Sequence, residues 1–144
     1  MPLLKKSKNP AIINVSSSAG LCSVVGQSMY SASKYALRAF TECLSIENKD
    51  IYVAGIYPGF IKTDIFSKQK CDDKSIKLIN KFMMPVNKAS KKIIKKINRK
   101  RKKIVIGFDG KLLNFGGKYA PFLFPKSMKK VFKISKLDIF KDIK

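Results

Sequence analysis

The chain has 144 residues, carries 31 Lys and Arg against 9 Asp and Glu for a formal charge of +22, and contains no histidine. The lack of histidine excludes Ser–His–Asp and Cys–His catalysis, and it excludes every metal site that needs a histidine ligand. Hydrophobic residues make up 45% of the sequence, which indicates a folded domain and argues against a wholly disordered chain.

The first part of the chain predicts a strand, a helix and a second strand. Residues 11–15 are a short β-branched run that a Ser- and Gly-rich loop closes. From Ser28 to about Glu47 the apolar residues follow a helical period, and residues 51–57 form a second apolar run that Pro58 stops. We expect the helix to present a wide apolar face made of Ala32, Tyr35, Ala36, Ala39, Phe40, Cys43, Leu44 and Ile46.

The second part of the chain predicts one more helix and one more strand. Residues 65–85 have no strong period and are expected to form a loop and a short helix. A helix is predicted from about 87 to 100 and a strand at 103–106. Continuous apolar strands separated by helices indicate an α/β fold whose parallel sheet is covered on both faces.

Basic residues are concentrated in the second part of the chain. Residues 1–64 hold 7 of the 31 basic and 4 of the 9 acidic residues, a net charge of +3, whereas residues 65–144 hold the other 24 and 5, a net charge of +19. We expect a single domain over 1–144. Its catalytic core segment would be 1–66, followed at 67–144 by a substrate-side loop, a basic helix, the last strand and a C-terminal segment.

Three polar residues of the first part form a pattern with chemical meaning. Ser17 stands at the carboxyl end of the first predicted strand, where ligands bind in open α/β sheets. Tyr30 and Lys34 are four residues apart, which places both on one face of a helix. A cation beside a phenol stabilises the phenolate by roughly 3–4 kcal/mol at an effective dielectric of ~20. The tyrosine could then move a proton while the serine holds a carbonyl oxygen, as hydride transfer at a carbonyl requires.

Three runs resemble the short-chain dehydrogenase/reductase family: INVSSSAG at 13–20, YSASK at 30–34 and YPGFIKT at 57–63. The resemblance implies a Rossmann-type fold, NAD or NADP as cofactor, a small-molecule carbonyl or alcohol substrate, and a homo-oligomer. It implies that Tyr30 is the catalytic acid/base and that Ser17 positions the substrate oxygen. Lys34 would stabilise the phenolate, and Lys34 and Tyr30 would both bind the cofactor, Lys34 at the nicotinamide ribose. The remaining cofactor-binding residues would be Pro58, Gly59, Ile61 and Thr63.

The sequence also departs from the family. The TGxxxGxG turn, the NNAG segment and the catalytic Asn that normally precede the serine strand do not occur in these 144 residues. We therefore expect a likeness to the C-terminal half of the family only, with an incomplete sheet and a basic helical C-terminal extension. The 144 residues would then be a truncated, inactive fragment of an NAD(P)(H)-dependent oxidoreductase. The alternatives are a non-catalytic remnant and a basic protein that binds membrane or nucleic acid.

Each assignment has a simpler alternative. Ser17 could be an ordinary turn residue, Tyr30 and Lys34 could be a surface pair, and Thr63 could cap a helix. The lysines around the predicted helix at 87–100 could be its solvated face, because an apolar stripe at helical spacing stands among them: Val86, Ala89, Ile93, Ile94 and Ile97.

The C-terminal segment combines aromatic and basic residues. The stretch at 119–125, YAPFLFP, precedes Lys126, Lys129, Lys130 and Lys133. This pattern is typical of a substrate-side lid, a subunit contact or a shallow, weak membrane attachment. The lysine-rich segment at 88–103 has no nucleic-acid-binding motif and no aromatic stacking platform, so we expect no specific nucleic-acid partner.

The cysteines and apolar runs bear on location. Cys22, Cys43 and Cys71 form no CxxC pair, which suits a reducing compartment without structural zinc. No apolar run approaches the ~18 residues of a membrane span, and the start of the chain has too short an apolar stretch for a signal peptide. We expect a cytoplasmic location and no metal.

Overall fold

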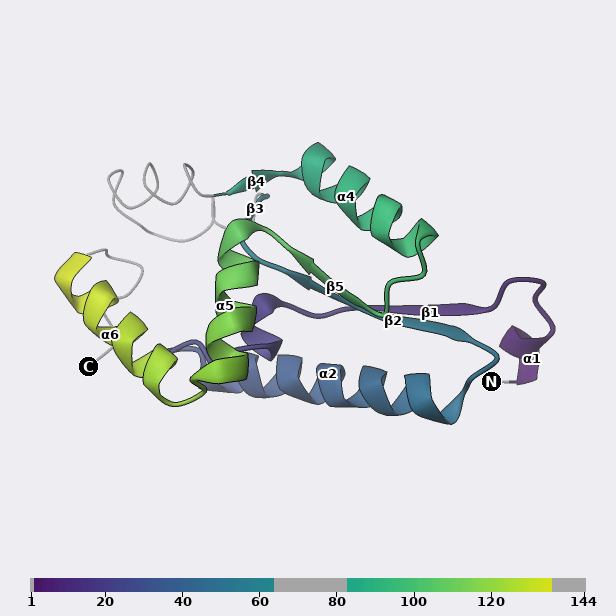
Figure 1. Ribbon diagram of the computed structural model, residues 1–144, viewed down its shortest axis with the longest axis horizontal. Helices are drawn as coiled ribbons and strands as arrows, with labels where there is room; N and C mark the ends of the chain where they lie inside the picture. The colour runs from purple at the N-terminus through teal and green to yellow at the C-terminus, as the bar shows by residue number, and fades with distance from the viewer. Residues whose placement is uncertain (1, 64–82, 136–144) are drawn as a thin grey trace.

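The computed structural model of the chain describes residues 2–63 and 83–135 (Figure 1). Helices and strands alternate along the chain, as the sequence predicts. The elements are α1 (Pro2–Lys5), β1 (Ala11–Val15), the 3-10 turn η1 (Ser18–Gly20), α2 (Ser28–Glu47), β2 (Tyr52–Pro58), β3 (Ile61–Lys62), β4 (Met84–Pro85), α4 (Val86–Asn98), β5 (Lys103–Ile106), α5 (Phe108–Tyr119) and α6 (Leu123–Ser135).

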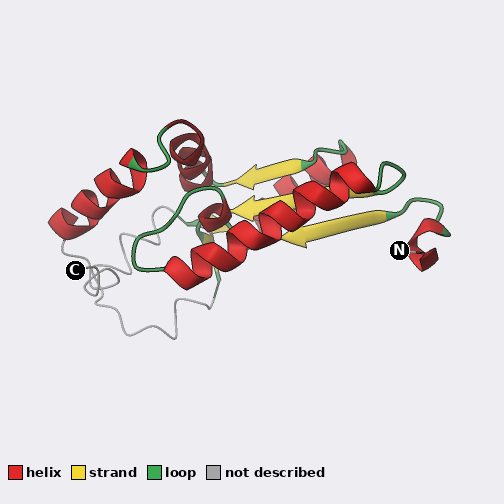
Figure 2. Cartoon of the chain, turned by 90° about the horizontal axis from the view of Figure 1, so that it is seen from below, coloured by secondary structure: helices red, strands yellow, loops and turns green. Residues whose placement is uncertain are grey.

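A three-stranded parallel sheet organises the fold. Its strand order is β1-β2-β5, so β2 lies in the middle. Helix α4 lies on one side of the sheet and α2 on the other (Figure 1), and Figure 2 shows α2 running along the strands. The core between sheet and α4 is made of Ala54, Ile56, Ala89, Ile104 and Ile106. The predicted α/β class with a parallel sheet is confirmed.

The two faces of β1 differ in burial, which the sequence did not predict. Asn14 faces α2, because its Nδ2 donates a hydrogen bond to Thr41 Oγ1 at 2.9 Å. On the opposite face of the strand, Ile13 is 36% and Val15 59% exposed. Helix α4 packs against β5 and the middle of the sheet, and the core cluster beneath it holds no residue of β1. Helices thus lie on both faces of the sheet, as predicted, but in the described part of the chain one face of β1 is left exposed.

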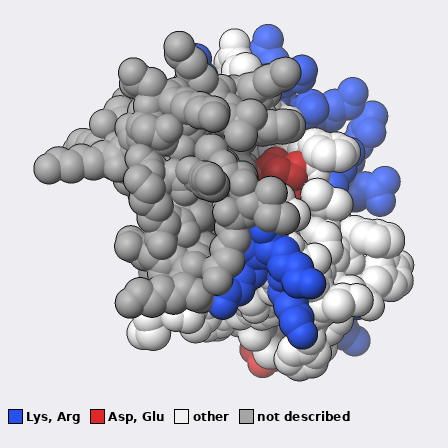
Figure 3. All heavy atoms as spheres, turned by 90° about the vertical axis from the view of Figure 1, so that its left-hand side faces the viewer, with Lys and Arg blue, Asp and Glu red and all other residues white. Residues whose placement is uncertain are grey.

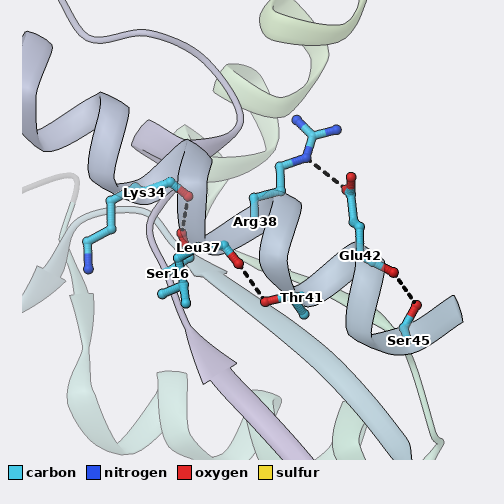
Figure 4. Close-up of polar contacts among 7 residues, drawn as sticks. All are labelled: Ser16, Lys34, Leu37, Arg38, Thr41, Glu42 and Ser45. Carbon is cyan, nitrogen blue, oxygen red and sulfur yellow. Dashed lines mark hydrogen bonds and ion pairs between the residues drawn. The ribbon is translucent and has the colours of Figure 1, made fainter. Parts of the chain in front are cut away.

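Helix α2 has the predicted bounds but buries a different face. Its buried residues are Ser31 and Thr41, whereas Phe40 and Ile46 are 56% and 72% exposed. Thr41 Oγ1 accepts from Asn14 and donates to the Leu37 carbonyl at 2.7 Å, so the polar contact with the sheet is satisfied (Figure 4). The predicted apolar face therefore points outward at Ala32, Ala36, Ala39, Phe40, Cys43 and Ile46.

The basic part of the chain forms the predicted helix and strand. The helix predicted at 87–100 is α4, and the strand predicted at 103–106 is β5. A short parallel pair between β3 and β4 was not predicted. The other predictions for 65–82, among them the boundary between 66 and 67, lie outside the described residues. Within those residues, no helix combines the length and the apolar character needed to cross a membrane.

Candidate active site

Of the predicted site residues, Ser17 follows β1 and Pro58 and Gly59 stand at the end of β2, whereas Tyr30 and Lys34 lie in the first turns of α2. The backbone N–H of Ser16, just after β1, donates to the Ile56 carbonyl of β2 at 2.8 Å. The N–H of Gly59, just after β2, donates to the Ile106 carbonyl of β5 at 2.8 Å. Because parallel strands end at the same edge of a sheet, the three loops that follow them meet there. Open α/β sheets bind ligands at this edge.

Ser17 is held at the first residue of a tight turn. It has an extended backbone and caps η1, and its Oγ accepts a hydrogen bond from the Ala19 N–H at 3.2 Å. The side chain is half-buried. A hydroxyl that accepts one hydrogen bond can still donate its own proton. Ser17 is thus both a turn residue and a group that could hold a substrate oxygen, so the two readings of this residue are compatible.

The turn around Ser17 is fastened to the helix turn that carries Lys34. Ser16 Oγ donates a hydrogen bond to the Lys34 carbonyl at 3.0 Å (Figure 4). A Cβ added to Gly20 would lie 2.6 Å from the same carbonyl oxygen, so only glycine allows this approach. Both contacts place the loop after β1 directly against the first part of α2. The structure therefore brings Ser17 to the segment that holds Tyr30 and Lys34.

Tyr30 and Lys34 form the pair that their spacing predicts. The Lys34 Nζ lies 5.5 Å from the centroid of the Tyr30 ring. The ring is 45% exposed, so a ligand can reach the phenol. The ammonium points away from the neighbouring Arg38–Glu42 ion pair (Figure 4), whose two atoms are 2.8 Å apart. The Lys34 charge is therefore available to the phenol and to a bound anion.

The turn after β2 is tied to the loop after β5 by a residue that the sequence analysis missed. The Asp109 carboxylate, at the start of α5, accepts a hydrogen bond from the Phe60 N–H. A Cβ on Gly59 would overlap both of its oxygens. Burial raises the pKa of Asp109, and hydrogen bonds from the backbone N–H groups of Phe60 and Gly110 act in the opposite direction. In the sequence, Asp109 stands between Gly107 and Gly110, just after the predicted strand at 103–106. This pattern is the signal that could have pointed to Asp109.

The remaining predicted residues lie at the end of β2 and in the segment after it, where Ile61 packs against the core between the sheet and α4. Pro58 ends β2 and pairs with Ile106, and Ile61 belongs to β3. Thr63 is exposed, and whether it caps a helix concerns residues outside the described part. In residues 2–63 and 83–135, no three His, Cys, Asp or Glu side chains come together to hold a metal.

Sequence comparison finds relatives of the first part of the chain. The model of a family described as short chain dehydrogenase matches residues 1–74. Over 62 residues the chain is 45% identical to the 3-oxoacyl-(acyl-carrier-protein) reductase FabG of Chlamydia trachomatis, covering 42% of this chain and 25% of that protein. Over 67 residues it is 39% identical to dehydrogenase/reductase SDR family member 7B of Xenopus laevis, and this match covers 45% of this chain and 21% of that protein. The match spans a quarter or less of each relative.

Structure comparison extends the likeness over most of the chain. A short-chain dehydrogenase of Burkholderia cenocepacia in complex with NADP is 20% identical, with a TM-score of 0.68 over 90% of this chain and 51% of its own. A short-chain dehydrogenase of Sphingobium yanoikuyae in complex with NADPH is 19% identical, with a TM-score of 0.60. The match covers 99% of this chain and 49% of that one. At this identity the likeness shows a Rossmann-like fold, and the chain spans about half of each structure.

These comparisons correct the expectation that only the C-terminal half of the family is represented. The matched residues 1–74 are the N-terminal part of this chain, and the shared fold covers at least 90% of it in both structures. The strand–helix–strand unit that contains Ser17, Tyr30 and Pro58 lies within residues 1–74, and this part of the chain is the one that matches the family model.

Proposed function

Because the chain belongs to the short-chain dehydrogenase family, we propose that it acts as part of an oxidoreductase that reduces a carbonyl or oxidises a secondary alcohol, with Tyr30 as the acid/base. The observation that carries the proposal is the Lys34 ammonium 5.5 Å from the centre of the exposed Tyr30 ring. The contacts of Ser16 and Gly20 with the Lys34 carbonyl join the loop that carries Ser17 to the same helix, which supports a role for Ser17 beside the phenol. These groups are the ones that carbonyl chemistry needs.

Each side chain has a separate task. Tyr30 donates its phenolic proton to the carbonyl oxygen during reduction, and it accepts the proton of the alcohol during oxidation. Lys34 stabilises the phenolate by its charge, because the two groups are neighbours on α2. Ser17 donates its hydroxyl proton to the substrate oxygen while its own oxygen accepts from Ala19. The oxygen of the substrate is thereby held between a hydroxyl and a phenol.

The proposed cofactor is NADP or NAD, which supplies or takes the hydride when bound. Two solved structures with the same fold hold NADP and NADPH, which supports this choice without deciding between the two dinucleotides for this chain. Lys34 and Tyr30 would hold the nicotinamide ribose, and Pro58, Gly59, Ile61 and Thr63 would border the nicotinamide. A homo-oligomer, a small-molecule substrate and a cytoplasmic location stay predictions.

The experiment uses a chimera, because residues 1–144 contain no TGxxxGxG turn. The dinucleotide-binding segment of an active relative is joined ahead of residues 1–144, and ketone reduction is followed through NADPH oxidation. Tyr30→Phe should lower kcat by ~10²–10⁴-fold, because it removes the transferable proton, and it should leave NADPH binding largely intact, because Lys34 still contacts the ribose. Lys34→Ala should weaken both turnover and NADPH binding.

Tyr35→Phe is the matched control, since Tyr35 lies on the same helix and is also partly exposed. This variant should keep the unsubstituted rate. If Tyr30→Phe also kept most of that rate in an active chimera, the assignment of Tyr30 as the acid/base would be wrong.

A further inference from the structure

Helix α5 has an apolar face that points away from the protein. Its inward face consists of Gly110, Leu113 and Gly116, all buried. A second row of apolar side chains lies outside and continues into the start of α6. The exposed fractions are 78% for Phe108, 48% for Leu112, 61% for Phe115, 63% for Tyr119, 90% for Phe122 and 69% for Leu123. The spacing of the first four places them on one face of the helix. A contiguous apolar patch of this kind marks an interaction surface.

The turn between α5 and α6 is well packed although its apolar side chains are exposed. Phe124 lies against Gly116 so closely that a Cβ there would overlap its ring. The N–H of Phe124 donates to the Ala120 carbonyl at 2.9 Å, and the N–H of Ala120 donates to the Gly116 carbonyl at 2.8 Å. These contacts fix where α6 begins. They leave Phe122 and Leu123 at the tip of the turn, directed outward.

Lysines and no acidic residues accompany this apolar surface. Residues 110–135 contain six lysines, no arginine and no Asp or Glu. Lys118 Nζ lies 4.8 Å from the centre of the Tyr119 ring, next to the apolar row. Lys126 and Lys130 are exposed on the first turns of α6. Figure 3 views this end of the molecule, where basic side chains are far more extensive than acidic ones on the described surface.

The combination of aromatic, aliphatic and lysine side chains favours a lipid surface over a nucleic acid. Exposed aromatic rings such as Phe115 and Tyr119 are also what base stacking uses. Leu112 and Leu123, however, add aliphatic surface that stacking does not use, and the segment has no arginine. Helix α4 is richer in lysine but has no aromatic residue, and it lies well away from α6 (Figure 1). Apolar and basic groups coincide on α5 and α6.

We propose that the α5–α6 turn docks onto the surface of a lipid bilayer that contains anionic headgroups. Phe122 and Leu123 enter the boundary between headgroups and acyl chains, Phe115 and Tyr119 lie against it, and Lys118, Lys126 and Lys130 contact the headgroups. Shallow apolar insertion and lysine attraction are the two contributions on which interfacial binding depends. The attachment is peripheral and reversible, since few side chains are available to enter the bilayer.

A fluorescence experiment tests the insertion directly, because the chain has no tryptophan. Phe122→Trp places a single tryptophan at the tip, and Phe40→Trp places one on the exposed face of α2 as the control. With vesicles that contain phosphatidylglycerol, the emission of the tip variant should shift to shorter wavelength. Vesicles of phosphatidylcholine alone should produce a much smaller shift. The control should show no shift with either vesicle.

A charge-matched pair of variants separates local binding from the effect of net charge. Lys126→Glu with Lys130→Glu and Lys88→Glu with Lys92→Glu each lower the formal charge from +22 to +18. All four lysines are exposed. In vesicle sedimentation, the α6 pair should lose at least about tenfold in affinity and the α4 pair clearly less. This measurement needs no tryptophan, and circular dichroism checks that each variant is folded.

Three results would overturn the proposal. One is that the emission of Phe122→Trp does not shift with anionic vesicles and that the Lys126→Glu, Lys130→Glu variant binds vesicles as tightly as the unsubstituted chain. Another is an equal loss of affinity for both pairs, which would indicate diffuse attraction by net charge. The third is a shift caused by RNA or by self-association of the chain in the absence of vesicles, which would assign the surface to another partner.

Discussion

The backbone N–H of Phe60 donates a hydrogen bond to the Asp109 carboxylate, although the two residues are 49 positions apart in the sequence. The bond connects the turn after β2 to the start of α5, and Gly59 lies against the same carboxylate. Since Pro58 and Gly59 border the proposed nicotinamide site, Asp109 supports one wall of that site. The first two predictions concern this contact.

Asp109 should make the stability of the protein depend on pH. Burial raises its pKa in the folded protein above the ordinary value of 3.8. The folded protein therefore binds the proton more tightly than the unfolded chain does. The resulting stabilisation is fully present below the unfolded pKa and is lost as the pH rises through the folded pKa. Asp109→Asn does not titrate, so the Tm of the wild type relative to this variant should fall over that interval. Thermal unfolding at a series of pH values measures this difference in Tm.

The control is Asp50→Asn, because Asp50 is exposed. A pH-independent difference between the wild type and Asp109→Asn would contradict the prediction.

Gly59 and Asp109 should be energetically coupled. Gly59→Ala places a methyl group onto the Asp109 carboxylate and should cost about 1–3 kcal/mol of unfolding free energy. Asp109→Ala leaves the Phe60 N–H without this acceptor and should cost about 1–3 kcal/mol. In the double variant the methyl group has room, so the combined loss should be smaller than the sum by about 1 kcal/mol or more. Urea unfolding of the four proteins gives the coupling, and strict additivity would show that the contact does not exist in solution.

The uncovered face of β1 should make the 144-residue chain prone to association. Ile13 and Val15 are exposed on one face of the strand, and within the described residues β1 pairs with β2 alone. Exposed strand edges with apolar faces promote aggregation. We expect the chain to bind an apolar dye and to self-associate, and we expect Val15→Lys to reduce both. Ile46→Lys, at an exposed position of α2, is the control with the same change in charge. A monomer with a sharp thermal transition and no dye binding would refute this prediction.

Dinucleotide binding by residues 1–144 alone should be weak and sensitive to salt. A diphosphate is normally held by backbone N–H groups at a helix N-terminus after a glycine-rich turn, and the sequence contains no TGxxxGxG motif. A formal charge of +22 attracts any anion without direction and is screened over ~8 Å at physiological ionic strength. Titrations of NADPH fluorescence at low and moderate salt, with ATP as competitor, measure this. If NADPH binding resisted salt and ATP did not compete with it, this prediction would be wrong.

The sequence by itself determined the parts of the protein that depend on local order. Residues four apart share a helix face, so the Tyr30–Lys34 pair follows from spacing once α2 is predicted. Apolar runs and their terminating Ser, Pro and Gly residues set the strands and the edge where Ser17 and Pro58 lie. These features require no knowledge of distant contacts.

Tertiary structure decided what depends on which elements meet. The register of β2 with β5 brings Asp109 to Phe60, and no local pattern encodes that register. Ser31 and Thr41 form the buried side of α2, where Thr41 accepts from Asn14 of β1 and Ser31 accepts from the Val24 N–H, and both partners lie far from the helix in sequence or outside it. The aromatic residues of α5 and α6 would suit a core equally well from sequence. Only the packing of Phe124 on Gly116 turns Phe122 and Leu123 outward, because burial is a property of the assembled neighbours and not of the residue.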